Sequence, residues 1–164
     1  MALAYVARFA TSGARFEAYL KRKLRERGWD GEGEPDLAAL VGRYVELGYI
    51  DDEAFARSRS GGLLRRGYGP RRVEQELTAA GIAGEIREGV RPRTGAARAA
   101  ALALARKRGF GPFGDTPDRA RREKQITAML RAGHSLDSAR ELVNAESIER
   151  AEEWAASAEE DIAE

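Results

Sequence analysis

Glycines that end apolar-periodic segments recur at a nearly constant spacing along this chain. Gly28, Gly81 and Gly133 are 53 and 52 residues apart, and each lies four positions after an apolar residue. Glycine favours helix ends because it adopts the left-handed backbone of a helix C-cap without strain. A period of about 50 residues is typical of tandem helical modules, which bury their apolar faces against one another. The spacing therefore predicts three copies of one helical unit. Coincidental glycines in a nine-helix bundle are the alternative.

Apolar residues between these stops follow the period of an amphipathic helix. Leu37, Leu40 and Val41 share one face of such a helix, and no run alternates with the period of two expected of a strand. Each repeat is expected to begin and end with a helix, at 2–10 and 37–47, 52–66 and 83–90, and 95–108 and 135–144. We therefore predict an all-α chain of three tandem three-helix repeats that form an elongated, curved molecule. The predicted boundaries are 1–50, 51–92 and 93–145, followed by an acidic C-terminal tail or helix at 146–164.

Two local signals bear on the helix boundaries. Gly61 and Gly62 lie inside the first helix of the second repeat, so we expect that helix to kink or fray. Each interior glycine costs about 1 kcal/mol relative to alanine. In the third repeat, Asp115 or Thr116 is expected to cap a helix that begins at Pro117, because proline suits the first helical position.

Charge is distributed unevenly, although the formal net charge is only +1. Residues 146–164 carry eight acids and one base, which leaves residues 1–145 with a net charge of +8. A basic body with an acidic tail favours a polyanionic or acidic partner, for which the tail would compete within the molecule. The alternative is that these charges only solvate the helices.

Composition excludes several classes of protein. There are no cysteines, which excludes disulfides and thiolate metal sites. No apolar run approaches the roughly 20 residues that a membrane-spanning helix needs. Residues 1–9 lack the charged start and long apolar core of a secretory signal. We therefore expect a cytoplasmic protein with no membrane partner.

A glycine-rich motif and an acidic motif could each indicate a chemical site, but both are better explained by structural roles. Residues 109–114 match GxGxxG, but a helix rather than a strand precedes them, and Pro112 lacks an amide that would face phosphate. This motif is interpreted as a helix stop and a turn. Asp51, Asp52 and Glu53 open a helix, where acids offset the positive end of the helix dipole, so we expect them to cap it.

The single histidine is expected to pack rather than to react. His134 follows a helix-stopping glycine and has no partner histidine for a metal site, so we place it in the apolar slot that Trp29 and Ile82 fill in the sister repeats. No serine has a base at a catalytic spacing. The sequence therefore predicts no enzymatic activity, no cofactor and no metal.

Aromatic residues beside basic helix ends are the best candidates for partner contact. Tyr49 and Tyr68 are expected mainly as wedges between helices, but Tyr68 lies among arginines, and tyrosine and arginine favour interface hot spots. A second basic helix end also precedes a glycine–aromatic pair. The candidate residues for binding a partner are Arg65, Arg66, Tyr68, Arg71 and Arg72 in the second repeat and Arg106, Lys107 and Arg108 in the third.

Two segments carry a pattern known from one protein family. The first is Gly48-Tyr49-Ile50-Asp51-Asp52 with Phe55-Ala56, and the second is Gly67-Tyr68-Gly69-Pro70-Arg71-Arg72-Val73 with Glu76-Leu77 and Gly81-Ile82. This combination resembles the RecX family of bacterial regulatory proteins, and the resemblance extends from about residue 2 to residue 145. It implies a tandem three-helix-repeat fold and a modulator of the RecA recombinase in DNA repair and the SOS response.

The resemblance also implies the partner. RecX-like proteins bind the RecA–single-stranded DNA filament and mostly reduce its growth, ATP hydrolysis, strand exchange and repressor cleavage. We therefore expect a monomer that binds the RecA filament and contacts single-stranded DNA within it. One alternative is a DNA-binding module, because three-helix units can place a helix in the major groove. Another is a purely structural scaffold.

Overall fold

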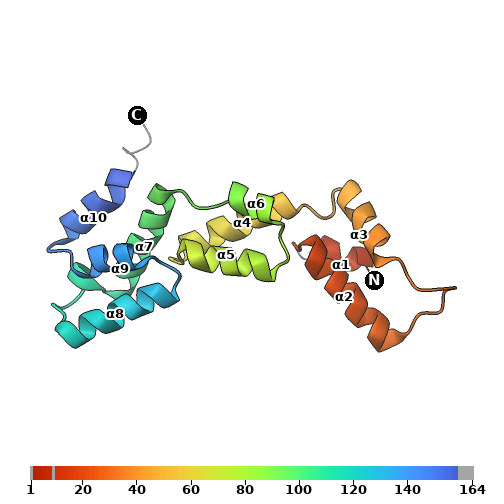
Figure 1. The fold of residues 1–164 in the computed structure, drawn as a ribbon, viewed down its shortest axis with the longest axis horizontal. Coiled ribbons are helices and arrows are strands. Elements are labelled where there is room, and N and C mark those ends of the chain that lie inside the picture. The colour runs from red at the N-terminus through yellow and green to blue at the C-terminus, as the bar shows by residue number, and fades with distance from the viewer. Residues whose placement is uncertain (1, 9, 159–164) are drawn as a thin grey trace. The chain divides into compact units, whose positions relative to one another are not determined.

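The computed structural model describes residues 2–8 and 10–158, and every regular element in those ranges is helical (Figure 1). The predicted all-α class is confirmed, and the predicted helix ends agree with the structure to within two residues. The elements are α1 (Ala2–Arg8), α2 (Gly13–Arg27), α3 (Leu37–Glu46), α4 (Asp52–Arg65), α5 (Pro70–Ala79), α6 (Gly84–Gly89), α7 (Thr94–Arg108), the short 3-10 helix η1 (Gly111–Phe113), α8 (Arg119–Arg131), α9 (Leu136–Val143) and α10 (Ile148–Ala156). Among the described residues, no helix is long and apolar enough to cross a bilayer.

The chain divides into two compact units. Unit 1 comprises the residues up to Ser58 together with Leu77–Val90. Unit 2 comprises Arg59–Glu76 and the residues from Arg91 onward. The division passes through α4 and α5, so residues of the predicted second repeat belong to both units. The predicted repeat boundaries themselves stay a prediction.

The core of unit 1 is aromatic. Phe16 of α2 is fully buried and packs with Val6, Leu20 and Ile50. The ring of Tyr5 stacks between its neighbours, with centroids 6.1 Å from Phe16 and 4.0 Å from Tyr19. Burying such rings contributes much of the hydrophobic stabilisation available to helices this short.

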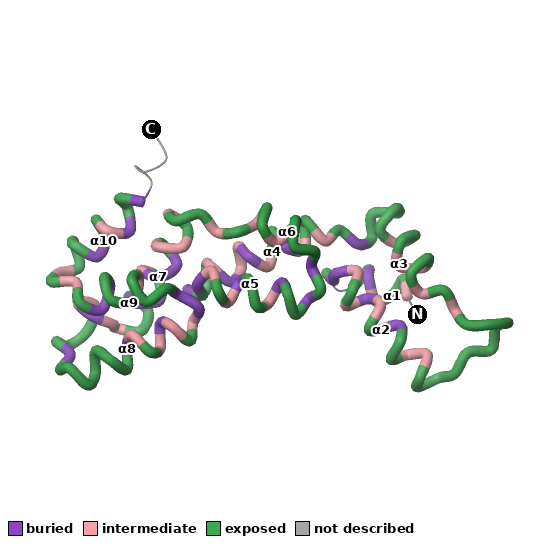
Figure 2. The backbone as a smooth tube through the Cα atoms, viewed as in Figure 1, coloured by how far each residue is buried: buried purple, intermediate pink, exposed green. Residues whose placement is uncertain are grey.

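The core of unit 2 forms where α7 packs against α9 and α10, with α8 against α9 (Figure 2). Alanines dominate the buried face of α7, and small side chains let neighbouring helices approach closely. Larger residues fill the remaining space, among them Met129 and Leu142, both fully buried. The predicted acidic segment begins within this core, because Ala151 of α10 is buried there while residues 159–164 of the segment lie outside the described residues.

The predicted glycine stops are confirmed. Gly28, Gly81 and Gly133 have φ of 78°, 71° and 95°, in the region that side chains disfavour. Gly81 and Gly133 each end a helix in a Schellman arrangement, in which the next residue donates its amide to a carbonyl five residues back. Helix α4, in contrast, continues through Gly61 and Gly62, so the expected interruption of that helix is not seen.

Three sequence-based expectations are wrong. Helix α8 is capped by Asp118, whose carboxylate accepts from Arg121 N at 2.8 Å, so the helix begins two residues after Pro117. Trp29 is 53% exposed, whereas Ile82 and His134 are buried, because a long acidic segment rather than a short turn follows α2. Tyr49 and Tyr68 are 48% and 37% exposed, so neither is buried as a wedge between helices.

Candidate partner-binding site

The turn between α4 and α5 presents an aromatic side chain at the protein surface. Gly67 ends α4 with φ of 87°, and the amide of Tyr68 donates to Leu63 O at 3.0 Å. Such a closure turns the chain sharply while satisfying the last carbonyls of the helix. The Tyr68 ring remains 37% exposed, between the end of one helix and the start of the next.

Backbone hydrogen bonds hold the α4–α5 turn against the turn between α8 and α9. The Gly69 amide donates to Ala132 O at 2.8 Å, and the Arg71 amide donates to Gly133 O at 3.1 Å. A Cβ added at Gly69 would collide with Gly133 O, and one added at Gly133 would collide with the backbone of Arg72. We call this contact, between residues 67–72 and 132–134, the turn joint. Glycine is required on both sides because two backbones approach each other directly.

His134 completes the turn joint. Its side chain is 1% exposed, and its Nε2 lies 2.8 Å from Gly67 O. A carbonyl can only accept, so Nε2 carries the proton and donates. Burial lowers the pKa of His134, partly opposed by this hydrogen bond, which keeps the ring neutral near pH 7. The histidine is therefore a packing and positioning residue, as its place after a helix stop predicts.

A contact of the same kind occurs within unit 1. Ser12, just before α2, donates its hydroxyl to Ala80 O at 2.5 Å. A Cβ on Gly81 would collide with Ala14 Cβ. In unit 1 the turn before α2 contacts the turn after α5, and in unit 2 the turn before α5 contacts the turn after α8. The repeat seen in the glycine spacing thus extends to packing.

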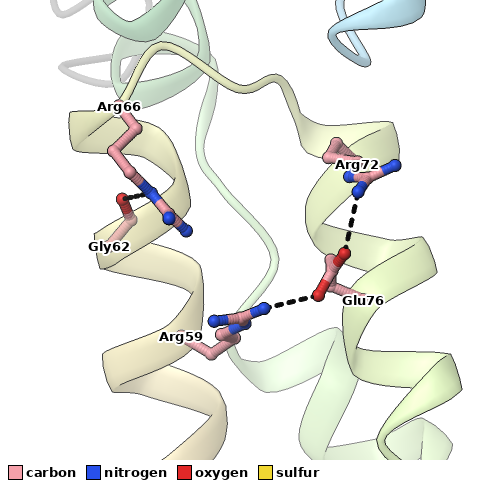
Figure 3. A network of polar contacts seen from close by, with 5 residues as sticks. All are labelled: Arg59, Gly62, Arg66, Arg72 and Glu76. Atoms are coloured by element: carbon pink, nitrogen blue, oxygen red, sulfur yellow. Dashed lines mark hydrogen bonds and ion pairs between the residues drawn. The ribbon is translucent and has the colours of Figure 1, made fainter.

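Arginines flank the exposed Tyr68 ring. The guanidinium carbons of Arg66 and Arg72 lie 5.7 and 5.9 Å from the ring centroid. Arg66 Nε donates to Gly62 O at 3.1 Å, and Arg72 pairs with Glu76 at 3.0 Å (Figure 3). Each cation–π contact of this kind stabilises by about 0.5–1 kcal/mol at exposed sites. Arg66, Tyr68 and Arg72, which we call the Tyr68 cluster, are thus preorganised at the surface.

Glu76 ties this cluster to the body of α4. Its carboxylate binds Arg72 on one oxygen and Arg59 on the other, the latter at 2.7 Å (Figure 3). Sequence reasoning gave neither Arg59 nor Glu76 a role in the site, although Glu76 follows Arg72 at the helical i, i+4 spacing. The 17-residue separation of the pair has no periodic signal, and the contact exists only because α4 and α5 pack side by side.

The remaining candidate residues fall into two groups, one beside the Tyr68 cluster and one at the end of α7. Arg65 and Arg71 are exposed beside the Tyr68 cluster. Lys107 and Arg108 are exposed at the end of α7, but Arg106 pairs with Glu152 of α10 and lies 5.5 Å from the Phe113 ring centroid. Within the described ranges, no hydrogen bond, ion pair or ring contact joins residues 106–108 to the Tyr68 cluster.

The other motifs have structural roles. Asp51 Oδ1 accepts from Ala54 N at 2.8 Å and caps α4, as predicted. Asp52 instead accepts from Gly13 N at 2.9 Å, which ties α4 to the start of α2. The GxGxxG match forms the end of α7 and the 3-10 turn η1. No cluster of His, Asp or Glu in residues 2–8 and 10–158 has the geometry of a metal site.

Comparison with known proteins gives a consistent result. A family model described as RecX, second three-helix domain, matches residues 51–90. The chain is 34% identical over 152 residues to the regulatory protein RecX of Mycolicibacterium vanbaalenii, covering 85% of this chain and 78% of that protein. It is 41% identical over 87 residues to the regulatory protein RecX of Mycobacterium sp. (strain JLS), covering 51% of this chain but only 44% of that protein. The fold is similar to the crystal structure of RecX from Lactobacillus salivarius, with a TM-score of 0.65 over 87% of this chain and 89% of that chain, at 19% identity.

Short helices joined by paired turn contacts define a helical protein built from like modules, with a surface cluster of arginines around a tyrosine. Gly67 and Gly69 of the turn joint lie in the family motif read from the sequence. The chain belongs to the RecX family of regulatory proteins, which are non-enzymatic.

Proposed function

We propose that this protein binds the RecA–single-stranded DNA filament in the cytoplasm and mostly inhibits RecA's recombinase, ATPase and coprotease activities. The observation that carries this proposal is membership of the RecX family, at 34% identity over 152 residues with a regulatory protein RecX. The resemblance of the Gly48–Ala56 and Gly67–Ile82 segments supports it further.

The Tyr68 cluster is the contact that we propose for the filament. A half-exposed tyrosine held between two arginines matches the composition of interface hot spots, which favour tyrosine and arginine. Arg66, Tyr68 and Arg72 are also held in place before binding, which reduces the entropy lost on association. Arg65 and Arg71 supply further charge beside the ring.

Three tandem modules would let the protein contact more than one RecA protomer. Each contact can be weak, because linkage raises the effective concentration of the remaining contacts. An elongated, curved arrangement of the modules would suit such binding along a filament. Arg106, Lys107 and Arg108 are the proposed contacts of the third module.

A direct test measures ATP hydrolysis by RecA on single-stranded DNA with increasing amounts of the protein. We expect inhibition at or below stoichiometric ratios. Hydrolysis that is unchanged at excess protein would contradict the proposal. Binding to naked duplex DNA without an effect on RecA would instead favour a DNA-binding module.

Tyr68→Ala tests the proposed contact. Removing a hot-spot tyrosine costs about 2 kcal/mol or more of binding, so half-inhibition should need roughly 30-fold more protein. Tyr49→Ala is the matched control, because Tyr49 also follows a helix-ending glycine, donates its amide to a carbonyl five residues back and is half-exposed. Equal effects of the two substitutions would place the contact elsewhere.

A further inference from the structure

Helix α8 carries a dense group of cations at its start. Arg119, Arg121, Arg122 and Lys124 are all exposed, and no acid lies in the first turn. We call these four residues the α8 basic surface. Of these four, Arg119 alone forms an ion pair with another described residue, Glu123 at 3.4 Å, and its side chain is still 94% exposed. In residues 2–8 and 10–158, the side chains of Arg121, Arg122 and Lys124 have no hydrogen-bonding or ionic partner.

This placement opposes helix stability. The start of a helix carries a partial positive charge, so cations there are repelled and acids are favoured. Asp118, the N-cap, and Glu123 are the only acids from Asp118 to Lys124. Arg119, Arg121 and Arg122 therefore lie in the first turn, where folding alone would favour the opposite charge.

Helix α2 offers a contrast, because several of its bases occupy positions where they stabilise the helix. Lys21 and Lys23 pair with Glu17 and Glu26 at 2.6 and 2.5 Å. Arg25 and Arg27 lie in the last turn of α2, where the helix dipole stabilises cations. The bases of α2 thus need no external partner, whereas those of α8 gain from an external anion.

The part of α8 that follows these bases is firmly held. Met129 is fully buried in the core of unit 2, and the side chain of Gln125 accepts from Gly111 N at 3.0 Å. These contacts anchor the helix in unit 2, so its exposed first turn is held in a fixed place. The α8 basic surface is therefore presented on a helix that does not need to fold on binding.

We propose that the α8 basic surface binds the phosphate backbone of single-stranded nucleic acid. Arginines present rigid, bidentate donors that match phosphate, and four bases within two helical turns can contact successive phosphates. The surface lies outside the candidate residues that the sequence singles out. It deepens the proposed function, on which it rests, because a regulator bound to the RecA filament meets single-stranded DNA.

The test compares two variants of the full chain that lose the same charge. One is Arg121→Gln with Arg122→Gln, on the α8 basic surface, and the control is Arg25→Gln with Arg27→Gln, on α2. Binding to a fluorescent oligothymidylate is measured by anisotropy across salt, without RecA. The α8 variant should bind on the order of tenfold more weakly near 0.1 M salt, with a salt slope smaller by about 1.4. The control should bind within about twofold of wild type, because its arginines make no proposed phosphate contact.

Thermal unfolding gives a second readout, in which the α8 variant should gain stability although it loses affinity. The α8 variant should unfold about 1–4 °C higher than wild type, since it loses unfavourable dipole interactions, and the control should unfold lower. Equal loss of affinity in both variants, no loss in the α8 variant, or equal competition by polyglutamate would overturn the proposal. Inhibition of RecA by a wild-type protein that does not bind oligothymidylate would overturn it too, while leaving the proposed function standing.

Discussion

At Gly69, the absence of a side chain lets two turns bond backbone to backbone. The residue has no positive φ, so its requirement comes from space rather than from conformation. The carbonyl of Gly133 occupies the position that a Cβ would take. The family motif of residues 67–70 is therefore explained by packing in unit 2, and it leaves Tyr68 free to face outward.

Gly69→Ala should destabilise the protein by about 2 kcal/mol, because backbone atoms must move to admit the methyl group. Urea unfolding followed by circular dichroism measures the change. Gly42→Ala, inside α3, is the control: nothing lies within 4 Å of its Cβ, so it should raise the free energy of unfolding by up to about 1 kcal/mol. Equal effects of the two substitutions would contradict the turn joint.

His134 makes stability depend on pH. Its pKa is lowered below 6.5 in the folded protein, so above pH 6.5 both folded and unfolded forms are neutral there. As the pH falls below 6.5, the unfolded chain binds a proton that the folded protein resists, and stability is lost.

The variant His134→Gln separates this effect from other acid titrations. A glutamine amide can donate to Gly67 O but does not titrate. Between pH 7.5 and 5.5, wild type should therefore lose up to about 1.4 kcal/mol more unfolding free energy than the variant. Parallel losses measured by urea unfolding at the two pH values would show that His134 does not titrate as its burial requires.

Prediction from the sequence succeeded for residues whose conformation or role depends on their own chemistry and the local backbone. Gly133 and Asp51 act as predicted because a left-handed turn and a helix N-cap each depend on local backbone geometry. It failed at Trp29, whose exposure depends on the length of the following segment. The cap at Asp118 was missed because Asp115 and Thr116 satisfy the same local rule.

At the scale of elements, α10 contacts the basic side of α7. Arg98 donates to Trp154 O at 3.1 Å and lies 4.9 Å from the centroid of its ring. Arg106 pairs with Glu152, and both side chains are about half exposed. Part of the acidic C-terminal segment thus occupies a base that we propose for partner binding.

Glu152→Gln should release Arg106 and strengthen binding to the RecA filament. An exposed pair contributes at most about 1 kcal/mol, so affinity should rise by up to about fivefold at low salt and less at high salt. Glu153→Gln is the control, because Glu153 pairs with Arg150 of its own helix and the charge change is identical. Filament binding that rises equally for both variants would indicate net charge rather than release of Arg106.

Helix positions were largely predictable because apolar periodicity and glycine stops act within single elements. Pairings between elements were not. The bond from Arg59 to Glu76 joins α4 and α5, and nothing in the spacing of the two residues indicates that their helices pack together. The Tyr68 cluster was predictable only in part for the same reason: Arg66, Arg72 and Glu76 lie within eight residues of Tyr68, whereas Arg59 comes from another helix.

At the scale of the whole molecule, the sequence predicts three repeats, and the structure resolves two compact units. The difference arises because contacts within a unit include the turns of neighbouring repeats as well as the helices of one repeat. Glycine spacing indicates where a repeat recurs, but it does not indicate how strongly adjacent repeats adhere. The elongated arrangement stays a prediction.

The turn joint has a consequence for how such proteins diverge. Two of its hydrogen bonds run from amide to carbonyl, so mutation of the surrounding side chains leaves donors and acceptors in place. Substitutions on the outer faces of the helices can therefore change what the protein recognises without removing the bonds that set the backbone register between successive repeats.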